Sequence, residues 1–428
     1  MSTLEYFELI AKIPRCSFKT DKMRNKIIEI ANTLSYKTSI DKSGNILCQK
    51  GEPKVCLQSH YDMVCLGDTQ NIELIETDGI LRAKNSTLGA DNGMGMAIMF
   101  TCMEKFDDLE CLFTNDEEVG LIGASSLELQ ISSSKLLNLD GEEEREIYIG
   151  CAGGIDVISK LTLEYLPLDK DELIYEISVK DLAGGHSGVD IDKNIDSAIK
   201  VLARELVRQE LKLLHIEGGE LRNSIAKNAK AVVSTCRDIK LFDATLHVKK
   251  IEHKRVYIKD GQNIIKALNA FAQGVREFDK SLSIPSSSIN LGVVRSKDGV
   301  LQVDCSVRAM QNSDLLSLAN ETESFFQLIG CQTLQSDGHK PWVPDIAEFA
   351  NEVKREMLKV YDEASFCAIH AGLECGIIIA QQSKKIEAVA IGPTIRFPHS
   401  LREECDLGSV KRISLVVERI IYGTNEVS

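Results

Sequence analysis

The apolar positions in the first part of the chain alternate between helical and strand-like spacing. Segments 21–36 and 93–106 carry apolar residues at helical spacing, whereas 54–64, 109–120 and 135–144 are short apolar runs that turn polar at their ends. Strands that alternate with helices predict an α/β fold, here with a mixed, largely parallel sheet.

The middle of the chain follows a different pattern. Strands and helices recur there in about two rounds of an α+β order, including a helix expected over 263–279. The α/β pattern then returns towards the C-terminus. We therefore predict a discontinuous α/β domain, residues 1–172 and 343–428, with an inserted α+β domain, residues 173–342. The two rounds suggest that the inserted domain is duplicated, although no clear sequence repeat is visible.

Composition narrows the classes of function. A length of 428 residues suggests two or three domains. The net charge of −14 argues against a nucleic-acid partner, because phosphate binding needs a basic face. No apolar run reaches the roughly 18 residues of a membrane span. The 13 cysteines form no C-x-x-C pair, and no signal peptide is recognisable. These features predict reduced thiols and a cytoplasmic location.

The segment STLGADNGMG, residues 86–95, places Asp91 among small residues. It fits neither the Walker pattern nor the dinucleotide fingerprint, and a carboxylate would repel phosphate. Small neighbours allow the backbone to approach closely, so Asp91 is well placed to face a cation. Taken alone, the segment is more typical of an ordinary Asp-Asn-Gly turn.

Other acidic and imidazole side chains stand where predicted strands end. His60 and Asp62 form an H-x-D pair, Glu117 and Glu118 are adjacent, and Asp140 closes an apolar run. The carboxyl ends of parallel strands share one edge of a sheet, so these side chains are expected to converge. Individually, each has an ordinary alternative, such as a solvated loop or a helix cap.

With His399, these residues form a set of two histidines and several carboxylates from distant segments. Such ligands suit zinc, or manganese or cobalt, better than calcium. Five ligands are too many for one tetrahedral zinc ion, but they suit two ions about 3.5–4 Å apart that share a carboxylate. Asp91 is the natural bridge.

A family resemblance becomes specific when the segments are taken in order. LQSHYDMV, STLGADNGMGMA, FTNDEEVGLIGA, LLNLDGEEEREIYIGCAGG, GGHSGVDI, HAGLECG and GPTIRFPHS resemble the successive motifs of the bacterial aminoacyl-histidine dipeptidases. These are cytosolic enzymes of the co-catalytic zinc peptidase superfamily, which includes carnosinases. The resemblance runs from about residue 5 to the C-terminus. It implies a zinc-peptidase-like catalytic domain and an inserted lid domain.

The resemblance also implies a ligand set for two zinc ions. His60 and Asp140 would hold one ion, Glu118 and His399 would hold the other, and Asp91 would bridge them. Mn²⁺ or Co²⁺ are the alternative metals.

Five further roles follow from the same resemblance. Glu117 would be the general base and Asp62 the acid that orients a ligand. His186, from the lid, would steady the oxyanion. Asn223 and Arg308 resemble substrate-contacting positions, with a turn and a surface ion pair as their respective alternatives.

The expected activity is hydrolysis of unblocked dipeptides, including Xaa-His substrates of the β-alanyl-histidine type. The alternatives are a tripeptidase or an N-acyl amino-acid amidohydrolase of the same superfamily. A remote alternative is a binding homologue without activity. The expected partners are a small peptide and, for a lid that is not duplicated, a second copy of the chain in a homodimer; neither a nucleic acid nor a membrane is expected.

Overall fold

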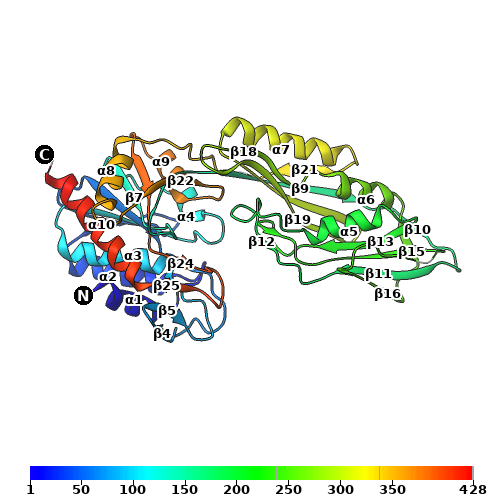
Figure 1. Cartoon of the computed structure of the whole chain (residues 1–428), viewed down its shortest axis with the longest axis horizontal. Coiled ribbons are helices and arrows are strands. Elements are labelled where there is room, and N and C mark those ends of the chain that lie inside the picture. Colours follow the sequence, from blue (N-terminus) through cyan, green and yellow to red (C-terminus); the bar gives the residue numbers. More distant parts are fainter. Residues whose placement is uncertain (238, 337, 427–428) are drawn as a thin grey trace. The chain divides into compact units, whose positions relative to one another are not determined.

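The computed structural model describes residues 1–237, 239–336 and 338–426, and these form two compact units (Figure 1). The first unit comprises Met1–Cys151, Trp342–Ala368 and Gly372–Ser428, and the second comprises Ala152–Pro341 and Ile369–Ala371. Residues 238, 337, 427 and 428, which fall within the predicted domains, lie outside the described residues. The first unit is thus discontinuous, and its bounds differ from the predicted domains at the first boundary, considered below, and at Ile369–Ala371, which belong to the second unit.

The first unit is built on an eight-stranded mixed sheet in the order β1-β2-β6-β3-β7-β23-β8-β22. Its central strands β6, β3, β7 and β23 are parallel, whereas β1, β2 and β8 join it antiparallel. The strand bounds are β1 Lys37–Ile40, β2 Ile46–Lys50, β3 Val55–His60, β6 Leu109–Thr114, β7 Lys135–Asn138, β8 Glu146–Cys151, β22 Ser365–Ile369 and β23 Glu387–Ala390. The predicted mixed α/β fold is confirmed.

Alternate residues of these strands pack into separate cores on the two faces of the sheet. Val55 and Leu57 belong to one apolar cluster, whereas Cys56 between them belongs to another. This alternation is expected because successive side chains of a strand point to opposite faces. The helices of this unit are α1 Thr3–Ala11, α2 Asp21–Thr33, α3 Ala90–Lys105, α4 Ile122–Ser125, α8 Glu348–Met357, α9 Glu374–Ala380 and α10 Leu407–Glu426.

Helix α3 is the central helix of this unit. Its residues from Asn92 to Met103 are all buried, and it packs against α1, α10 and strand β3. A helix that is apolar on every side is stable only when other elements surround it. The N-terminus of α3, which carries Asp91, is therefore fixed within the core.

A small four-stranded sheet lies in the same unit and was not predicted. Its order is β24-β25-β5-β4, with bounds β4 Leu74–Thr77, β5 Ile80–Ala83, β24 Ile395–Arg396 and β25 Glu404–Asp406. Strand β25 pairs with both β24 and β5, so the end of the chain is joined to an early hairpin. This pairing positions residues 397–403, the segment that contains His399.

Cys16 and Cys65 form a disulfide, with their Cα atoms 5.5 Å apart. The prediction that all thiols are reduced is therefore wrong for these two residues. Sequence spacing gave no sign of the pair, because the two cysteines are 49 positions apart and meet only through the fold. Most of the free cysteines are buried.

The second unit is an antiparallel α+β structure. Its nine-stranded sheet has the order β16-β11-β15-β13-β19-β20-β9-β21, and β18 also pairs with β19. The strand bounds are β9 Gly153–Thr162, β11 Leu173–Val179, β13 Lys212–Gly218, β15 Ala229–Thr235, β16 Leu246–Lys250, β18 Gly274–Asp279, β19 Ile284–Lys297, β20 Val300–Ala309 and β21 Gln332–Gln335.

Helices α5 Ala198–Leu206, α6 Gly261–Ala270 and α7 Asn312–Gln327 contribute to the apolar core of this unit. Two short strand pairs complete it. Strand β10 Tyr165–Pro167 pairs with β17 Val256–Ile258, and β12 Gly185–His186 pairs with β14 Ser224–Ile225.

Two expectations differ from the structure of the second unit. The first boundary was predicted at 172/173, but the unit begins at Ala152, because β9 pairs with β20 along its whole length. The helix expected over 263–279 ends at Ala270, and residues 274–279 form β18. Gly274, with φ of +109°, starts that strand, which pairs with β19.

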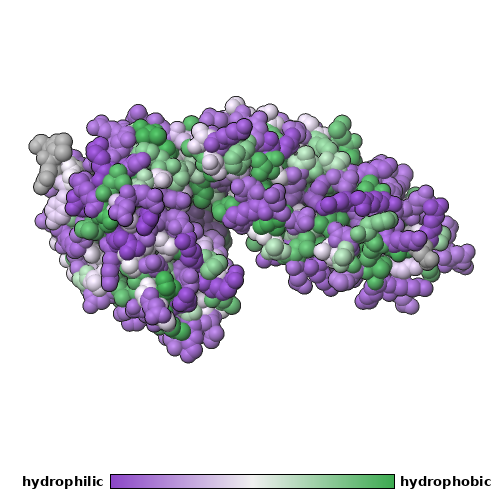
Figure 2. Space-filling view, viewed as in Figure 1, coloured by the Kyte–Doolittle hydropathy of each residue, from purple (hydrophilic) through white to green (hydrophobic). Residues whose placement is uncertain are grey.

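The face of the molecule drawn in Figure 2 is mainly polar. Figure 2 shows hydrophilic residues over most of the face in view, with apolar residues in small separate patches. Among the described residues, no helix combines the length and the apolar character needed to cross a bilayer.

Candidate metal centre

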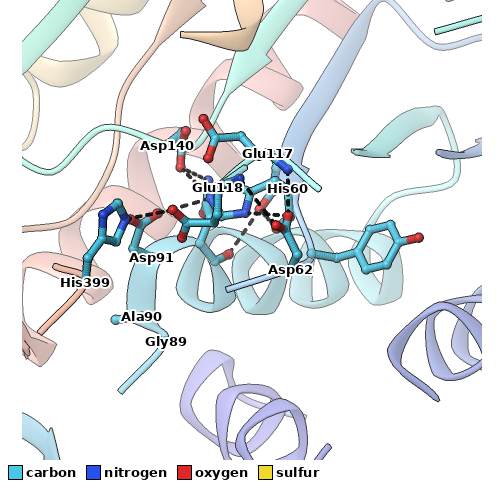
Figure 3. Close-up of polar contacts among 12 residues, drawn as sticks. His60, Asp62, Gly89, Ala90, Asp91, Glu117, Glu118, Asp140 and His399 are labelled. Atoms are coloured by element: carbon cyan, nitrogen blue, oxygen red, sulfur yellow. Dashed lines mark hydrogen bonds and ion pairs between the residues drawn. The ribbon is translucent and has the colours of Figure 1, made fainter. Parts of the chain in front are cut away.

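The parallel strands bring the predicted residues to one edge of the sheet (Figure 3). His60 is the last residue of β3 and lies opposite Thr114 of β6. Glu117 and Glu118 follow β6 directly, and Asp140 follows β7. Because these strands run parallel, the segments that follow them lie at the same edge.

Asp91 lies between the two histidines. Its Oδ1 is 3.1 Å from His60 Nε2, and its Oδ2 is 3.0 Å from His399 Nε2. The two oxygens of one carboxylate thus face two imidazoles that come from opposite ends of the chain. This is the arrangement expected of a carboxylate that bridges two cations.

Each histidine also contacts a second carboxylate. His60 Nε2 lies 3.4 Å from Asp140 Oδ1, and His399 Nε2 lies 2.8 Å from Glu118 Oε2. Potential ligand atoms of His60, Asp91 and Asp140 lie within 4.8 Å of one another, as do those of Asp91, Glu118 and His399. These two groups share Asp91, and they coincide with the two ligand sets that the resemblance implies.

The donor set fits divalent transition-metal ions. The Glu118 side chain is only 2% exposed, and its Oε1 is buried without a hydrogen-bond partner among the described residues. A buried carboxylate oxygen is costly unless it is hydrogen-bonded, paired or bound to a metal. Imidazole nitrogen with carboxylate oxygen suits zinc, manganese or cobalt, whereas magnesium and calcium prefer oxygen ligands alone.

Asp62 connects His60 to the adjacent glutamates. Its Oδ1 lies 3.3 Å from His60 Nδ1 and accepts the Glu117 N–H at 3.0 Å. Its Oδ2 accepts the Glu118 N–H at 3.3 Å and the Ser17 hydroxyl at 2.7 Å. A fully buried carboxylate in this position fixes the orientation of the imidazole ring and the backbone of residues 117–118.

Burial and charge shift the pKa values in this cluster. Burial alone would lower the pKa of His399, but hydrogen bonds to Asp91 and Glu118 outweigh it and raise the pKa to about 12. Burial would raise the pKa of Asp91, yet hydrogen bonds from both histidines hold it far below its ordinary value.

Glu117 differs from its neighbour Glu118 in its interactions. Burial raises the pKa of Glu117 well above its ordinary value, and the charges of Glu118 and Asp140 add to the shift, although His60 opposes it. Unlike Glu118, Glu117 has no imidazole at ion-pair distance among the described residues. A carboxylate with a raised pKa beside candidate metal ligands is a candidate acid or base.

The sequence interpretation missed several charged residues around this centre. Burial and the nearby charges of Asp91 and Asp140 raise the pKa of Glu142 to about 8. Glu374 is fully buried and accepts hydrogen bonds from Gln58 and Thr114 at 2.6 Å. The signal for Glu142 was its place in the run that follows Asp140.

Arg15 and Glu403 were also missed, and both contact the backbone around Asp91. Arg15 precedes a cysteine in an otherwise ordinary loop, and Glu403 has an identical neighbour, Glu404. Nothing in the sequence distinguishes the buried member of the Glu403–Glu404 pair from the exposed one.

The three remaining predicted site residues belong to the second unit. The His186 N–H donates to Asp190 Oδ2 at 2.7 Å, and His186 Nδ1 accepts the N–H of Val189 at 3.2 Å. The carbonyl of Asn223 accepts the Ser187 N–H at 2.8 Å. Arg308 lies on β20 and is 8% exposed. These contacts give each residue a defined local environment, and their roles towards a substrate stay predictions.

Known proteins resemble the chain over nearly its whole length. It is 30% identical to the cytosol non-specific dipeptidase of Escherichia coli (strain K12), over 95% of this chain and 94% of that protein. The crystal structure of aminoacylhistidine dipeptidase from Vibrio alginolyticus matches with a TM-score of 0.77 and 27% identity, over 97% and 96% of the two chains.

A more distant structure shares the fold. The M20 family metallo-carboxypeptidase Sso-CP2 of Sulfolobus solfataricus matches with a TM-score of 0.56 and 13% identity, and 98% of each chain is covered. No protein-family profile matches the chain. The similarity therefore rests on whole-chain relatives.

Proposed function

Since this chain belongs to the family of the Escherichia coli cytosol non-specific dipeptidase, we propose that it hydrolyses unblocked dipeptides, including Xaa-His substrates of the β-alanyl-histidine type. Family membership makes the chain a hydrolase of peptide bonds and a dipeptidase. The preference for histidine-containing substrates and the roles of individual residues are the proposal.

The proposed centre holds two divalent ions. His60 and Asp140 bind one ion, His399 and Glu118 bind the other, and Asp91 bridges them. The observation that carries this assignment is the position of Asp91, whose two oxygens lie 3.1 and 3.0 Å from the two Nε2 atoms. Zinc is the proposed metal, with manganese or cobalt as alternatives.

When bound, the two ions would supply the positive charge that acidifies a water molecule and polarises the scissile carbonyl group. Glu117 is the proposed general base. Its carboxylate takes the proton of the attacking water and delivers it to the leaving amine. Asp62 supports this step because it fixes the Glu117 N–H at 3.0 Å and orients the His60 ring.

The second unit is proposed to serve as the lid. His186 is the proposed group that steadies the oxyanion, and Asn223 and Arg308 are proposed substrate contacts. A cytoplasmic location is proposed from the name of the relative. A homodimer is proposed for the case in which the lid is not duplicated.

The test is a hydrolysis assay with metal-replete protein, in which dipeptides are compared with tripeptides and N-acyl amino acids. We expect turnover of dipeptides, including β-alanyl-histidine, that is accompanied by about two metal equivalents per chain. Glu117→Ala is expected to lower kcat by about 10²–10⁴-fold while both ions are retained. Glu76→Ala, at an exposed position of β4, is the matched control.

Three results would redirect the proposal. A marked preference for tripeptides or N-acyl amino acids would favour the alternative hydrolases. Normal turnover by Glu117→Ala would remove the assigned base. Metal binding without hydrolysis of any of these substrates would favour a binding homologue.

A further inference from the structure

Glu403 has a pattern of contacts unlike that of any other acidic residue near the metal centre. It is only 3% exposed, and it precedes β25 in the segment that also contains His399. Its Oε2 accepts the N–H groups of Leu88 and Gly89, both at 2.9 Å. Its Oε1 accepts those of Ala90 at 2.8 Å and Asp91 at 3.3 Å. One carboxylate thus satisfies four consecutive backbone donors.

Three of these donors, those of Gly89, Ala90 and Asp91, belong to the N-terminus of α3, where backbone N–H groups have no partner within the helix, and Leu88 precedes the cap. A Ser, Thr, Asp or Asn side chain at the cap commonly satisfies one of them. Here the cap is Gly89, with φ of +67°, and it has no side chain. Glu403, from the distant C-terminal segment, performs this function instead.

The backbone at Asp91 depends on hydrogen bonds from outside α3. Although Asp91 lies within the bounds of α3, its φ and ψ are −79° and 110°, and those of Asn92 are −107° and 35°. Neither pair of angles is helical, so the regular hydrogen bonds of α3 do not determine where the Asp91 side chain points. The contacts of residues 88–91 therefore decide its direction.

Arg15 holds the same loop from its carbonyl side. Its guanidinium, 2% exposed, donates to the carbonyl oxygens of Asp62, at 2.5 Å, and of Gly89. A Cβ atom at Gly89 would lie 2.7 Å from Arg15 Nη2, so a residue with a side chain there would displace the Arg15 guanidinium. Arg15 thus ties the loop that follows β3 to the loop that carries Asp91.

We infer that Glu403 is a positioning residue for peptide hydrolysis, which orients Asp91 between the two ions through the backbone of residues 88–91. Glu403 is not placed to contact the substrate or the reacting atoms; it acts through Asp91. The inference rests on the proposed function, because it assumes that Asp91 bridges two metals. Outer groups that orient metal ligands typically contribute 10–100-fold to metal affinity or activity.

The test compares Glu403→Gln with Glu404→Gln. The first variant keeps the size of the side chain but replaces one acceptor oxygen with an NH₂ group, so it leaves part of the four N–H groups without a partner. The second removes the charge of the adjacent glutamate, which pairs with exposed Arg82. Each metal-free variant is titrated with Zn²⁺ and with Co²⁺, and thermal unfolding is measured alongside.

For Glu403→Gln we expect metal affinity to fall by about 10–100-fold, and for Glu404→Gln by less than about twofold. In a dipeptidase assay of Glu403→Gln, added metal should restore part of kcat, and KM should stay close to that of the wild type. A variant that unfolds at a lower temperature but binds both ions with wild-type affinity would overturn the inference, since Glu403 would then be only a helix cap.

If Glu403→Gln does not fold, the more conservative variant Glu403→Asp still tests the inference. Glu403→Asp keeps the charge but is one methylene shorter, so we expect an intermediate metal affinity; wild-type affinity would overturn the inference. Wild-type protein that binds two ions but cleaves no dipeptide would overturn the proposed function, whereas the titrations would still decide the role of Glu403. Wild-type protein that binds no divalent ion would overturn both.

Discussion

Each of the two units contains histidines with shifted pKa values, and the two sets lie in opposite electrostatic environments. In the first unit, the His399 side chain is 50% exposed, and its hydrogen bonds to Asp91 and Glu118 raise its pKa to about 12. In the second unit, burial and the charge of Arg308 lower the pKa of His339 to about 4 and that of His370 to about 3. The same side chain is thus favoured as a cation in one unit and as a neutral ring in the other.

The difference shows how neighbouring residues determine what a histidine can bind. An imidazole among carboxylates belongs to a cluster with excess negative charge, and such a cluster attracts metal ions. In the second unit, His370 Nε2 lies 2.7 Å from the hydroxyl of Ser288, which is neutral, and the nearby charge is that of Arg308. A positively charged environment of this kind favours an anion over a metal ion.

The largest expected effect comes from Asp91→Ala, which removes the shared carboxylate of the first unit. Bound metal should fall from about two equivalents to below one. Bound metal typically stabilises the transition state by several kcal/mol, so we expect kcat to fall by about 10³-fold when metal is lost. Metal analysis and a dipeptidase assay check both. His370→Ala, in the second unit, is the control variant, and we expect it to bind as much metal as the wild type. If His370→Ala lost metal to the same extent as Asp91→Ala, the two sets of histidines would not differ in metal binding.

The next effect is confined to the first unit and concerns the Cys16–Cys65 disulfide. Reduction by dithiothreitol should lower the free energy of unfolding by about 2–4 kcal/mol, as is typical for a cross-link of this kind. The N–H of Met63, which donates to the backbone carbonyl of Arg15 at 3.1 Å, should then exchange faster with solvent. The exchange rates of amides in the second unit should not change. Hydrogen exchange with and without reductant tests this expectation. Equal protection of Met63 in both states would contradict it.

A third prediction concerns acid stability of the second unit. Below pH 6.5, the unfolded chain binds protons that folded His339 and His370 do not bind, because their pKa values are lowered to about 4 and about 3. The contribution of these two histidines to the free energy of unfolding is therefore complete above pH 6.5. It is lost as the pH falls, by up to about 1.4 kcal/mol per pH unit for each histidine. The free energy of unfolding, measured by urea unfolding between pH 4.5 and 7, should fall less steeply with decreasing pH for His370→Gln than for the wild type. An unchanged pH dependence would show that His370 takes up its proton equally in the folded and the unfolded state.

The smallest expected effect is a shift in the titration of His370. Burial is the first cause of its lowered pKa, and the charge of Arg308 is the second. Arg308→Gln should therefore raise the pKa by less than about one unit. Arg295→Gln, at an exposed position of β19, should leave it unchanged. Titration by NMR of the labelled ring resolves the two variants, and equal shifts would mean that Arg308 has no specific effect.

The convergence of the candidate ligands could be predicted because the order of parallel strands determines which segments lie at the same edge of the sheet. His60, Glu118 and Asp140 follow parallel strands, and the ends of such strands share one edge. The alternation of strands and helices in the first unit is likewise a local property. Both features can be derived without knowledge of distant contacts.

Features that depend on distant pairing could not be predicted. Glu403 and Glu404 look alike in the sequence, and only the pairing of β25 with β5 and β24 distinguishes their environments. The Cys16–Cys65 pair likewise depends on how two loops meet. The sequence predicts a helix where β18 lies, because residues 274–279 form a strand only through pairing with β19.

The discontinuous first unit has a consequence for biosynthesis. Asp140 and His399, which the proposed centre needs together, are separated by the entire second unit. During translation, His60, Asp91 and Asp140 therefore leave the ribosome long before His399 and Glu403 are synthesised. The emerging polypeptide cannot load a full pair of ions during translation, and truncation near the end of the message would yield an unloaded product. Peptidase activity would then begin only with a finished chain.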